Sequence, residues 1–207
     1  MNYITIGYDC SPAAALRNMN LRKFALPFDW VQSNIQSIEA CFRDDFARYH
    51  TELKFNSKKT RLIDVYGFEF PHDYPLLSTD ELQGPASQDI ISPSDALGEG
   101  AYEEKPIAEN WLNFYNIVKE KYDRRIERFR TFMKDPAPII VLSRYHKNED
   151  VFRLKELFAK YYNKTNVRFI NSSNKVFEND FMVNIHTEQN GEWNETSIWQ
   201  SAIDTCL

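Results

Sequence analysis

The sequence predicts an α/β fold in which a mainly parallel β-sheet is flanked by helices. Residues 139–143 form a continuous apolar run, Ile-Ile-Val-Leu-Ser, which is typical of a strand buried on both faces. A helical pattern at residues 151–162 and a β-branched stretch at 167–170 follow, so this segment predicts a β-α-β unit with parallel strands. Further strands are expected at residues 2–6 and 181–185.

The composition indicates a single folded domain, residues 1–207, with 43% hydrophobic and 27% charged residues. Residues 77–104 are rich in Ser, Asp, Gly and Pro, and we expect them to form a long loop inserted in this domain. The net charge of −5 argues against general nucleic-acid binding, and no apolar run reaches membrane-spanning length. The cysteines at positions 10, 41 and 206 lack metal-ligand or disulfide spacing, which favours a cytoplasmic protein without a metal or other cofactor.

The N-terminal strand runs through Gly7 and a polar turn into an Ala-rich helix. Pro12 suits the first helical position, which makes Ser11 the predicted N-cap, and the helix should end near residues 18–20. Cys10 therefore lies just outside a helix N-terminus, where the helix dipole and unpaired amides lower the pKa of a thiol. This position favours a cysteine nucleophile, although Cys10 could also be a small residue that fills the turn.

The middle of the chain alternates between helical and extended patterns. Apolar residues recur at helical spacing over residues 33–49, with Ser33 or Asn34 as the cap. The aromatic and β-branched stretch 62–70 predicts a strand or hairpin, and the loop that follows it contains His72 and Asp73.

The clearest helical pattern spans residues 111–133, and a last helix is expected to begin near Glu195. Within the long helix Arg124 and Arg125 are adjacent, so they point in different directions and at most one of them can reach a given site. Most of the basic residues around them are expected to form a solvated face.

Ligands of parallel α/β sheets bind beyond the carboxyl ends of the strands. The residues that follow predicted strands, and could therefore gather at this edge, are Cys10, Arg144, His146, Asn171 and His186. We expect a candidate site there.

Motifs spread over most of the chain resemble a known family. They are Ile-Gly-Tyr-Asp-Cys at residues 6–10, Pro-Phe-Asp-Trp at 27–30, Phe-Glu-Phe-Pro-His-Asp at 68–73 and Tyr-Asp-Arg-Arg-Ile-Glu-Arg-Phe at 122–129. These motifs are similar to those of papain-like cysteine peptidases found in bacteria and large DNA viruses, often beside glycan-related genes. The resemblance implies a nucleophilic Cys10 and a histidine base, with His72 at the position of the family's His-Asp pair.

The resemblance also leaves two fold expectations open. The family description implies a papain-like α+β fold, whereas the β-α-β unit favours a Rossmann-like three-layer arrangement. The Cys-Trp pair found around the papain nucleophile is absent, since Ser11 follows Cys10.

The first functional hypothesis is a cysteine-dependent hydrolase or acyl transferase that acts on a peptide, acyl or glycan substrate. Cys10 would attack a carbonyl, His72 would accept and return the proton, and Asp73 or Asp29 would orient His72. Amides of the helix N-terminus would stabilise the oxyanion. Alternatively, Asp29 only stabilises its turn, with Trp30 buried beside it. The expected substrate-binding residues are Asp29, Trp30, Arg124, Arg144, His146 and His186.

Two other functions remain open at this point. A glycan-modifying transferase could bind a nucleotide sugar at the same edge, with Arg124, Arg125 or Arg144 neutralising the diphosphate. The sequence has no Asp-x-Asp pair, which removes the simplest metal-dependent version of that transferase. A non-enzymatic binding domain is the third possibility.

Overall fold

The computed structural model describes residues 1–82, 105–175, 179–186 and 196–207. Its main sheet contains four strands, all parallel, in the order β1-β5-β6-β7. The strands are β1 (Asn2–Thr5), β5 (Ile139–Arg144), β6 (Val167–Ser173) and β7 (Met182–His186). The predicted mainly parallel sheet is therefore confirmed.

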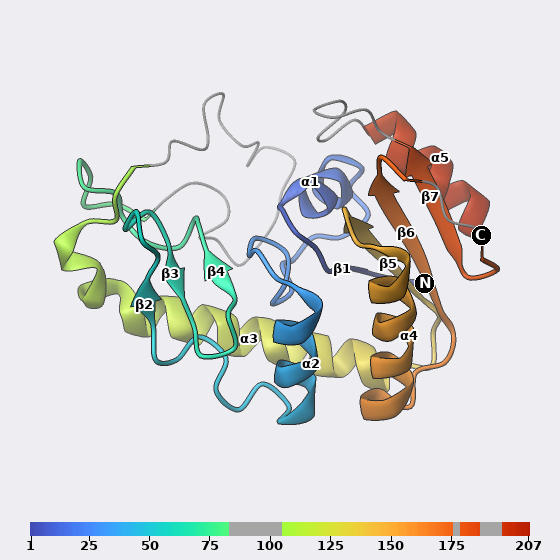
Figure 1. The fold of residues 1–207 in the computed structure, drawn as a ribbon, viewed down its shortest axis with the longest axis horizontal. Coiled ribbons are helices and arrows are strands. Elements are labelled where there is room, and N and C mark those ends of the chain that lie inside the picture. Colours follow the sequence, from blue (N-terminus) through green and yellow to red (C-terminus); the bar gives the residue numbers. More distant parts are fainter. Residues whose placement is uncertain (83–104, 176–178, 187–195) are drawn as a thin grey trace.

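Helices cover both faces of this sheet (Figure 1). One face carries α1 (Ser11–Asn18) and α5 (Thr196–Cys206), and the other carries α2 (Ile35–Arg43), α4 (Asn148–Tyr162) and part of α3 (Tyr115–Lys134). The side chains of β5 alternate between the two layers, because successive residues of a strand point to opposite faces. Ile140 and Leu142 pack in the cluster that contains Trp199 of α5, whereas Val141 packs in the one that contains Phe129 of α3.

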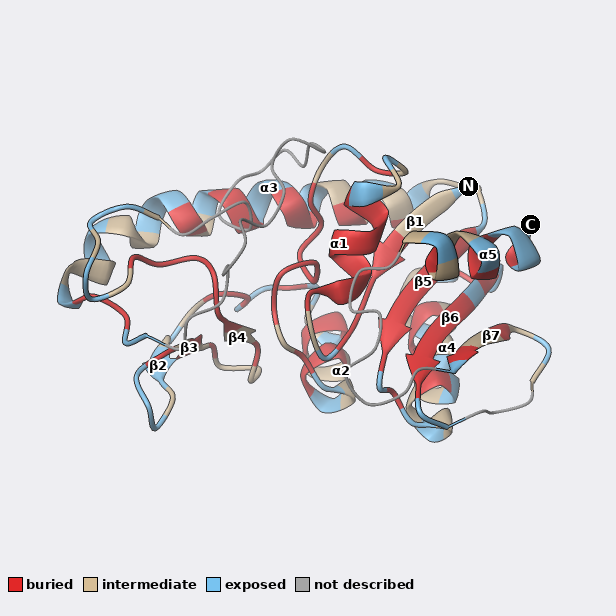
Figure 2. Ribbon diagram, turned by 90° about the horizontal axis from the view of Figure 1, so that it is seen from above, coloured by how far each residue is buried: buried red, intermediate tan, exposed pale blue. Residues whose placement is uncertain are grey.

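Burial is deepest where both layers of helices meet the sheet (Figure 2). Every residue of β5 is buried, as its apolar run Ile139–Leu142 predicts, and burial extends to Ser143 and Arg144 at the end of the strand.

A second, antiparallel sheet of three short strands lies beside the first part of α3 (Figure 1). Its strands are β2 (Lys54–Phe55), β3 (Leu62–Ile63) and β4 (Glu69–Phe70). The hairpin expected within residues 62–70 is thus present as β3 and β4, while β2 was not predicted. Helix α3 follows the 3₁₀ helix η2 (Glu109–Phe114) and extends from this sheet to the main one.

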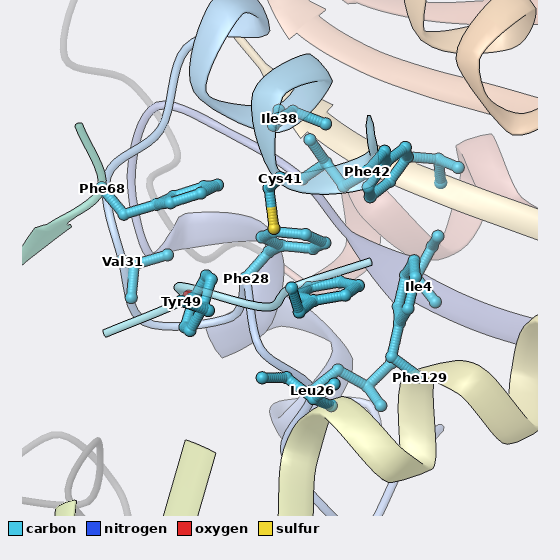
Figure 3. Packing of buried hydrophobic residues seen from close by; sticks show 14 of the residues in the cluster. Ile4, Leu26, Phe28, Val31, Ile38, Cys41, Phe42, Tyr49, Phe68 and Phe129 are labelled. Carbon is cyan, nitrogen blue, oxygen red and sulfur yellow. The ribbon is translucent and has the colours of Figure 1, made fainter. Parts of the chain in front are cut away.

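Phe28 lies at the centre of the core that joins the two sheets (Figure 3). Its side chain is 2% exposed, and its ring lies 5.6 Å from those of Phe68 and Phe129, measured between centroids. Cys41 of α2 points into the same cluster, which gives it a structural role. The Pro-Phe-Asp-Trp motif therefore anchors its loop by burying Phe28 and Trp30.

Some predicted boundaries differ from the structure. The helix expected over residues 33–49 ends at Arg43, because Asp45 and Phe46 have φ angles of 51° and 66°, which an α-helix cannot continue through. The helix expected from Trp111 begins as the 3₁₀ helix η2. Most of the loop expected at 77–104 lies outside the described residues. None of the helices in the described part of the chain combines the length and apolar character that a membrane span requires.

Candidate functional site

Cys10 and His72 lie side by side beyond the carboxyl end of β1. The distance from Cys10 Sγ to His72 Nε2 is 3.4 Å, within hydrogen-bonding range for sulfur. The two residues are 62 positions apart in sequence and are 7% and 8% exposed. Two segments distant in the chain therefore bring a thiol and an imidazole into direct contact.

Cys10 itself caps α1, one residue earlier than the sequence suggested. The helix begins at Ser11, and the Cys10 carbonyl accepts the N–H of Ala14 at 2.9 Å. Ser11 is therefore the first helical residue and not the N-cap. Asp9 fixes the turn before the helix, because its carboxylate accepts a hydrogen bond from the Ser11 N–H at 2.9 Å and pairs with Arg144 of β5 at 2.8 Å.

His72 is positioned by the two residues that follow it. Asp73 accepts hydrogen bonds from Lys121 Nζ and from the Tyr122 hydroxyl, the latter at 2.7 Å. The Tyr74 hydroxyl lies 2.7 Å from His50 Nε2. The loop that carries His72 is thereby fastened to α3 and to the core, since Asp73 and Tyr74 are both 0% exposed.

These contacts change the role expected for Asp73. The sequence predicted that Asp73 or Asp29 would orient His72, but both Asp73 oxygens are engaged by α3. Burial opposes ionisation of Asp73, yet the cations Lys121 and Arg125 outweigh it and hold its pKa below the ordinary value. The resulting carboxylate acts on His72 by charge, because it raises the His72 pKa.

The protonation of the Cys10–His72 pair differs from the expectation of a low thiol pKa. Burial, followed by the charges of Asp9 and Asp73, raises the pKa of the Cys10 thiol well above its ordinary value. Burial likewise lowers the pKa of His72 to about 4. The prediction from the helix dipole is wrong because loss of hydration disfavours an isolated charge more strongly than one short helix favours it. At neutral pH both groups are uncharged.

Asp29 is committed to structure. Its carboxylate accepts hydrogen bonds from Arg22, from Thr5 Oγ1 at 2.6 Å and from the Leu26 N–H at 2.7 Å. Asp29 is 1% exposed, so the alternative in which it stabilises its own loop fits the structure. Trp30, beside it, does reach the site, since its ring meets that of His72 edge-on with the centroids 6.4 Å apart.

Of the adjacent arginines in α3, the inner one is Arg125. Arg125 is fully buried and lies over the Tyr122 ring at 5.2 Å. Arg124, which we expected to bind substrate, is exposed and lines a different surface pocket with Asp123. The two adjacent arginines thus point in different directions, as the sequence predicted, and it is Arg125 whose charge lowers the pKa of Asp73.

The candidates that follow the later strands lie at different distances from Cys10, according to the position of their strand in the sheet. Arg144 is near Cys10 through Asp9, and His146 is buried beside the Ile6 backbone, to which it is hydrogen-bonded. Burial lowers the pKa of His146, and its Nε2 atom has no hydrogen-bond partner among the described residues.

His186, by contrast, is exposed at the end of β7, three strands from β1. At about 4.8 Å per strand the two strand ends are separated by about 14 Å. His186 therefore lies at the expected carboxyl edge of the sheet, but three strands away from the strand that leads to Cys10. Asn171 is used within the fold, where it donates to the His146 carbonyl at 2.8 Å.

Three residues around Asp73 and the Cys10–His72 pair were not predicted. His50 stacks between the rings of Tyr74 and Tyr115, and burial lowers its pKa to about 3. Lys121 is 3% exposed, and Arg61 lies close enough for its charge to lower the pKa of both Cys10 and His72. Lys121 could have been found, because it occupies the apolar stripe of the predicted helix three residues after Val118.

Among the described residues no cluster of three or more His, Cys, Asp or Glu side chains could hold a metal ion. The candidate site is thus a buried thiol and imidazole, a carboxylate held by α3, and the wall formed by Trp30.

Comparisons with known proteins agree with the motifs. Residues 1–187 match a family model described as "Putative papain-like cysteine peptidase (DUF1796)". The chain is also 26% identical over 193 residues to the uncharacterized protein R408 of Acanthamoeba polyphaga mimivirus, a match that covers 84% of this chain and 80% of that protein. No solved structure matches significantly. Neither match supports the nucleotide-sugar transferase.

Proposed function

The chain belongs to the family described as "Putative papain-like cysteine peptidase". From this premise we propose that it is a cysteine-dependent hydrolase with Cys10 as nucleophile and His72 as base. The observation that carries the proposal is the 3.4 Å contact between Cys10 Sγ and His72 Nε2. A nucleophilic cysteine needs a base within hydrogen-bonding reach, and this geometry supplies one.

The uncharged state of the pair determines how the proton moves. Cys10 Sγ attacks the substrate carbonyl carbon while its proton passes to His72 Nε2, so the thiolate need not exist beforehand. His72 then gives this proton to the leaving group and an acyl-enzyme forms on Cys10. Water then attacks the acyl carbon while His72 accepts its proton, the C–S bond breaks, and His72 returns the proton to Cys10 Sγ as the acid is released. With another acceptor in place of water the same steps transfer the acyl group.

Asp73 supports this cycle by charge. The imidazolium that forms on His72 is buried, and a nearby carboxylate stabilises it. Lys121 and Tyr122 hold that carboxylate in place. Asp73 is thus a positioning residue in our proposal, although it does not bond to the imidazole.

The oxyanion would be stabilised by the backbone N–H of Cys10. Within the first turn of α1 the Ser11 N–H is already taken by Asp9, and Pro12 has none. The Cys10 N–H precedes the helix and has no partner in the described part of the chain. The Trp30 indole N–H is a second donor candidate, because it is buried without a partner there and its ring contacts His72.

We further propose that the framework is the Rossmann-like three-layer arrangement and not the papain-like α+β fold. The support is the all-parallel order β1-β5-β6-β7 with helices on both faces. In this view the family description refers to chemistry shared with papain.

The proposal is tested with p-nitrophenyl acetate, an activated acyl donor that requires no knowledge of the natural substrate. We expect a rapid release of p-nitrophenolate and an acetylated peptide containing Cys10 in the mass spectrum of the quenched protein. Cys41 and Cys206, both buried and without a histidine within bonding distance among the described residues, should remain unmodified. Acetylation spread over all three cysteines, or none on Cys10, would reject the proposal.

A further inference from the structure

A small pocket lies between the two segments that deliver the catalytic pair. It has a volume of about 120 Å³ and is lined by Tyr8, Gln32, Ser33, Asn34, Gly67 and Glu69. Tyr8 precedes Cys10 by two residues and Glu69 precedes His72 by three, so one wall comes from each segment. Ser33 connects its own loop to the segment of Tyr8, because its N–H and its hydroxyl both donate to the Gly7 carbonyl, at 3.2 and 3.0 Å.

The hydrogen bonds around the pocket determine what it offers to a ligand. Arg61 donates to the side-chain oxygen of Gln32, and the Gln32 amide nitrogen has no hydrogen-bond partner among the described residues, which leaves it as a donor. The Asn34 oxygen accepts from the Ser37 N–H at 2.9 Å, which leaves the Asn34 amide nitrogen as a second donor. Glu69 uses Oε2 to bind Arg61 at 3.1 Å, and its Oε1 has no partner among the described residues.

The pocket is therefore lined by two side-chain amides that can donate and one carboxylate that can accept. Because Arg61 neutralises Glu69, an occupant needs no net charge. The volume is well below the roughly 300–1,000 Å³ typical of drug-sized ligands, so it suits a single small group. A carboxamide both accepts and donates hydrogen bonds and fits these groups, whereas a carboxylate or an aliphatic chain leaves some of them unpaired.

We propose that this pocket is a specificity subsite that binds the side-chain carboxamide of a glutamine or asparagine in the substrate. This assignment rests on the proposed function, since the pocket is lined by residues of the two chain segments that carry Cys10 and His72. It narrows the substrate class to peptides with such a residue near the attacked carbonyl.

The test uses three chloroacetyl amino-acid amides, built on glutamine, glutamate and methionine. Cys10 Sγ displaces chloride and its proton passes to His72, so the labelling rate reports how well each side chain is held near Cys10. We expect the glutamine probe to label Cys10 about tenfold faster than the other two, as for one or two added hydrogen bonds. Intact-protein and peptide mass spectrometry measures the rates.

Glu69→Gln provides the discriminating variant. The amide that replaces the carboxylate still accepts from Arg61 through its oxygen but turns an N–H donor toward the pocket. The preference for the glutamine probe over the glutamate probe should therefore fall to within about twofold. Glu120→Gln is the matched control, because Glu120 is exposed on α3, and it should keep the wild-type preference.

Equal rates with all three probes, or a preference unchanged in Glu69→Gln, would overturn the subsite. Labelling by iodoacetamide separates this result from failure of the proposed function. If iodoacetamide labels Cys10 faster in the wild type than in His72→Ala, Cys10 and His72 act together and only the subsite is rejected. If the two labelling rates agree, the proposed function itself is rejected.

Discussion

Cys10→Ala is expected to lower acyl-enzyme formation from p-nitrophenyl acetate by at least about 10³-fold while the protein stays folded. Alanine removes the sulfur atom that would form the acyl bond, and deletion of the nucleophile in well-studied hydrolases has effects of this size or larger. The fold should tolerate the change, because Cys10 already packs among Ala13, Ala14 and Ala25. The p-nitrophenolate burst measures the effect, and thermal unfolding verifies the fold.

His72→Ala should reduce the same burst by about 10²–10⁴-fold, the usual contribution of a general base. Cys206→Ala and His186→Ala are matched controls, because Cys206 lies on α5 and His186 ends the far strand β7. Both should keep the wild-type burst. A burst that persists in Cys10→Ala, or one that is lost equally in His186→Ala, would contradict the assignment.

Asp73→Asn is expected to destabilise the protein by about 3–5 kcal/mol. The substitution removes the carboxylate that pairs with Lys121, and the Lys121 side chain is only 4% exposed. Removing one partner of a buried ion pair is costly, whereas replacing both partners by apolar residues of similar size is often nearly neutral. The double variant Asp73→Asn/Lys121→Met should therefore recover at least half of the lost stability in chemical denaturation.

Asp123→Asn offers a control on the same helix. Asp123 pairs with Lys119, and their side chains are 53% and 29% exposed, so its loss should change the free energy of unfolding by no more than about 1 kcal/mol. If Asp73→Asn is no more harmful than Asp123→Asn, Asp73 does not hold the His72 loop to α3 as described.

The main sheet could be predicted because its strands have clear local patterns. The apolar run in β5 and the β-α-β pattern around α4 are compatible with few arrangements other than a parallel sheet. The early end of α2 could not be predicted, because the helical spacing of apolar residues continues through Phe46 to Tyr49. The chain nevertheless turns to left-handed conformations at Asp45 and Phe46. Strand β2 was missed as well; it contains only two residues. The side chains of Phe46 and Tyr49 are buried in the Phe28 core from a loop.

The pairing of Cys10 with His72 came from the family motifs, because no spacing rule connects residues 62 positions apart. Predictions that depended on which strands are neighbours were less reliable. His186 follows a strand as expected, but that strand, β7, is the outermost one on the side of the sheet opposite to β1. The direction of the Cys10 pKa was missed for a different reason, since local sequence shows a helix N-terminus but not burial under distant segments.

The most direct test of the central claim is the pH dependence of Cys10 alkylation by iodoacetamide in the wild type and in His72→Ala. Because burial lowers the pKa of His72 to about 4, its neutral form should assist the thiol throughout the neutral range and fail only as the pH falls through that value. The wild-type rate should thus be nearly constant between about pH 5 and 8. The His72→Ala rate should be at least about tenfold lower at pH 7 and rise about tenfold per pH unit, as for an unassisted thiol of raised pKa. Identical profiles in the two proteins would show that Cys10 and His72 do not act as nucleophile and base.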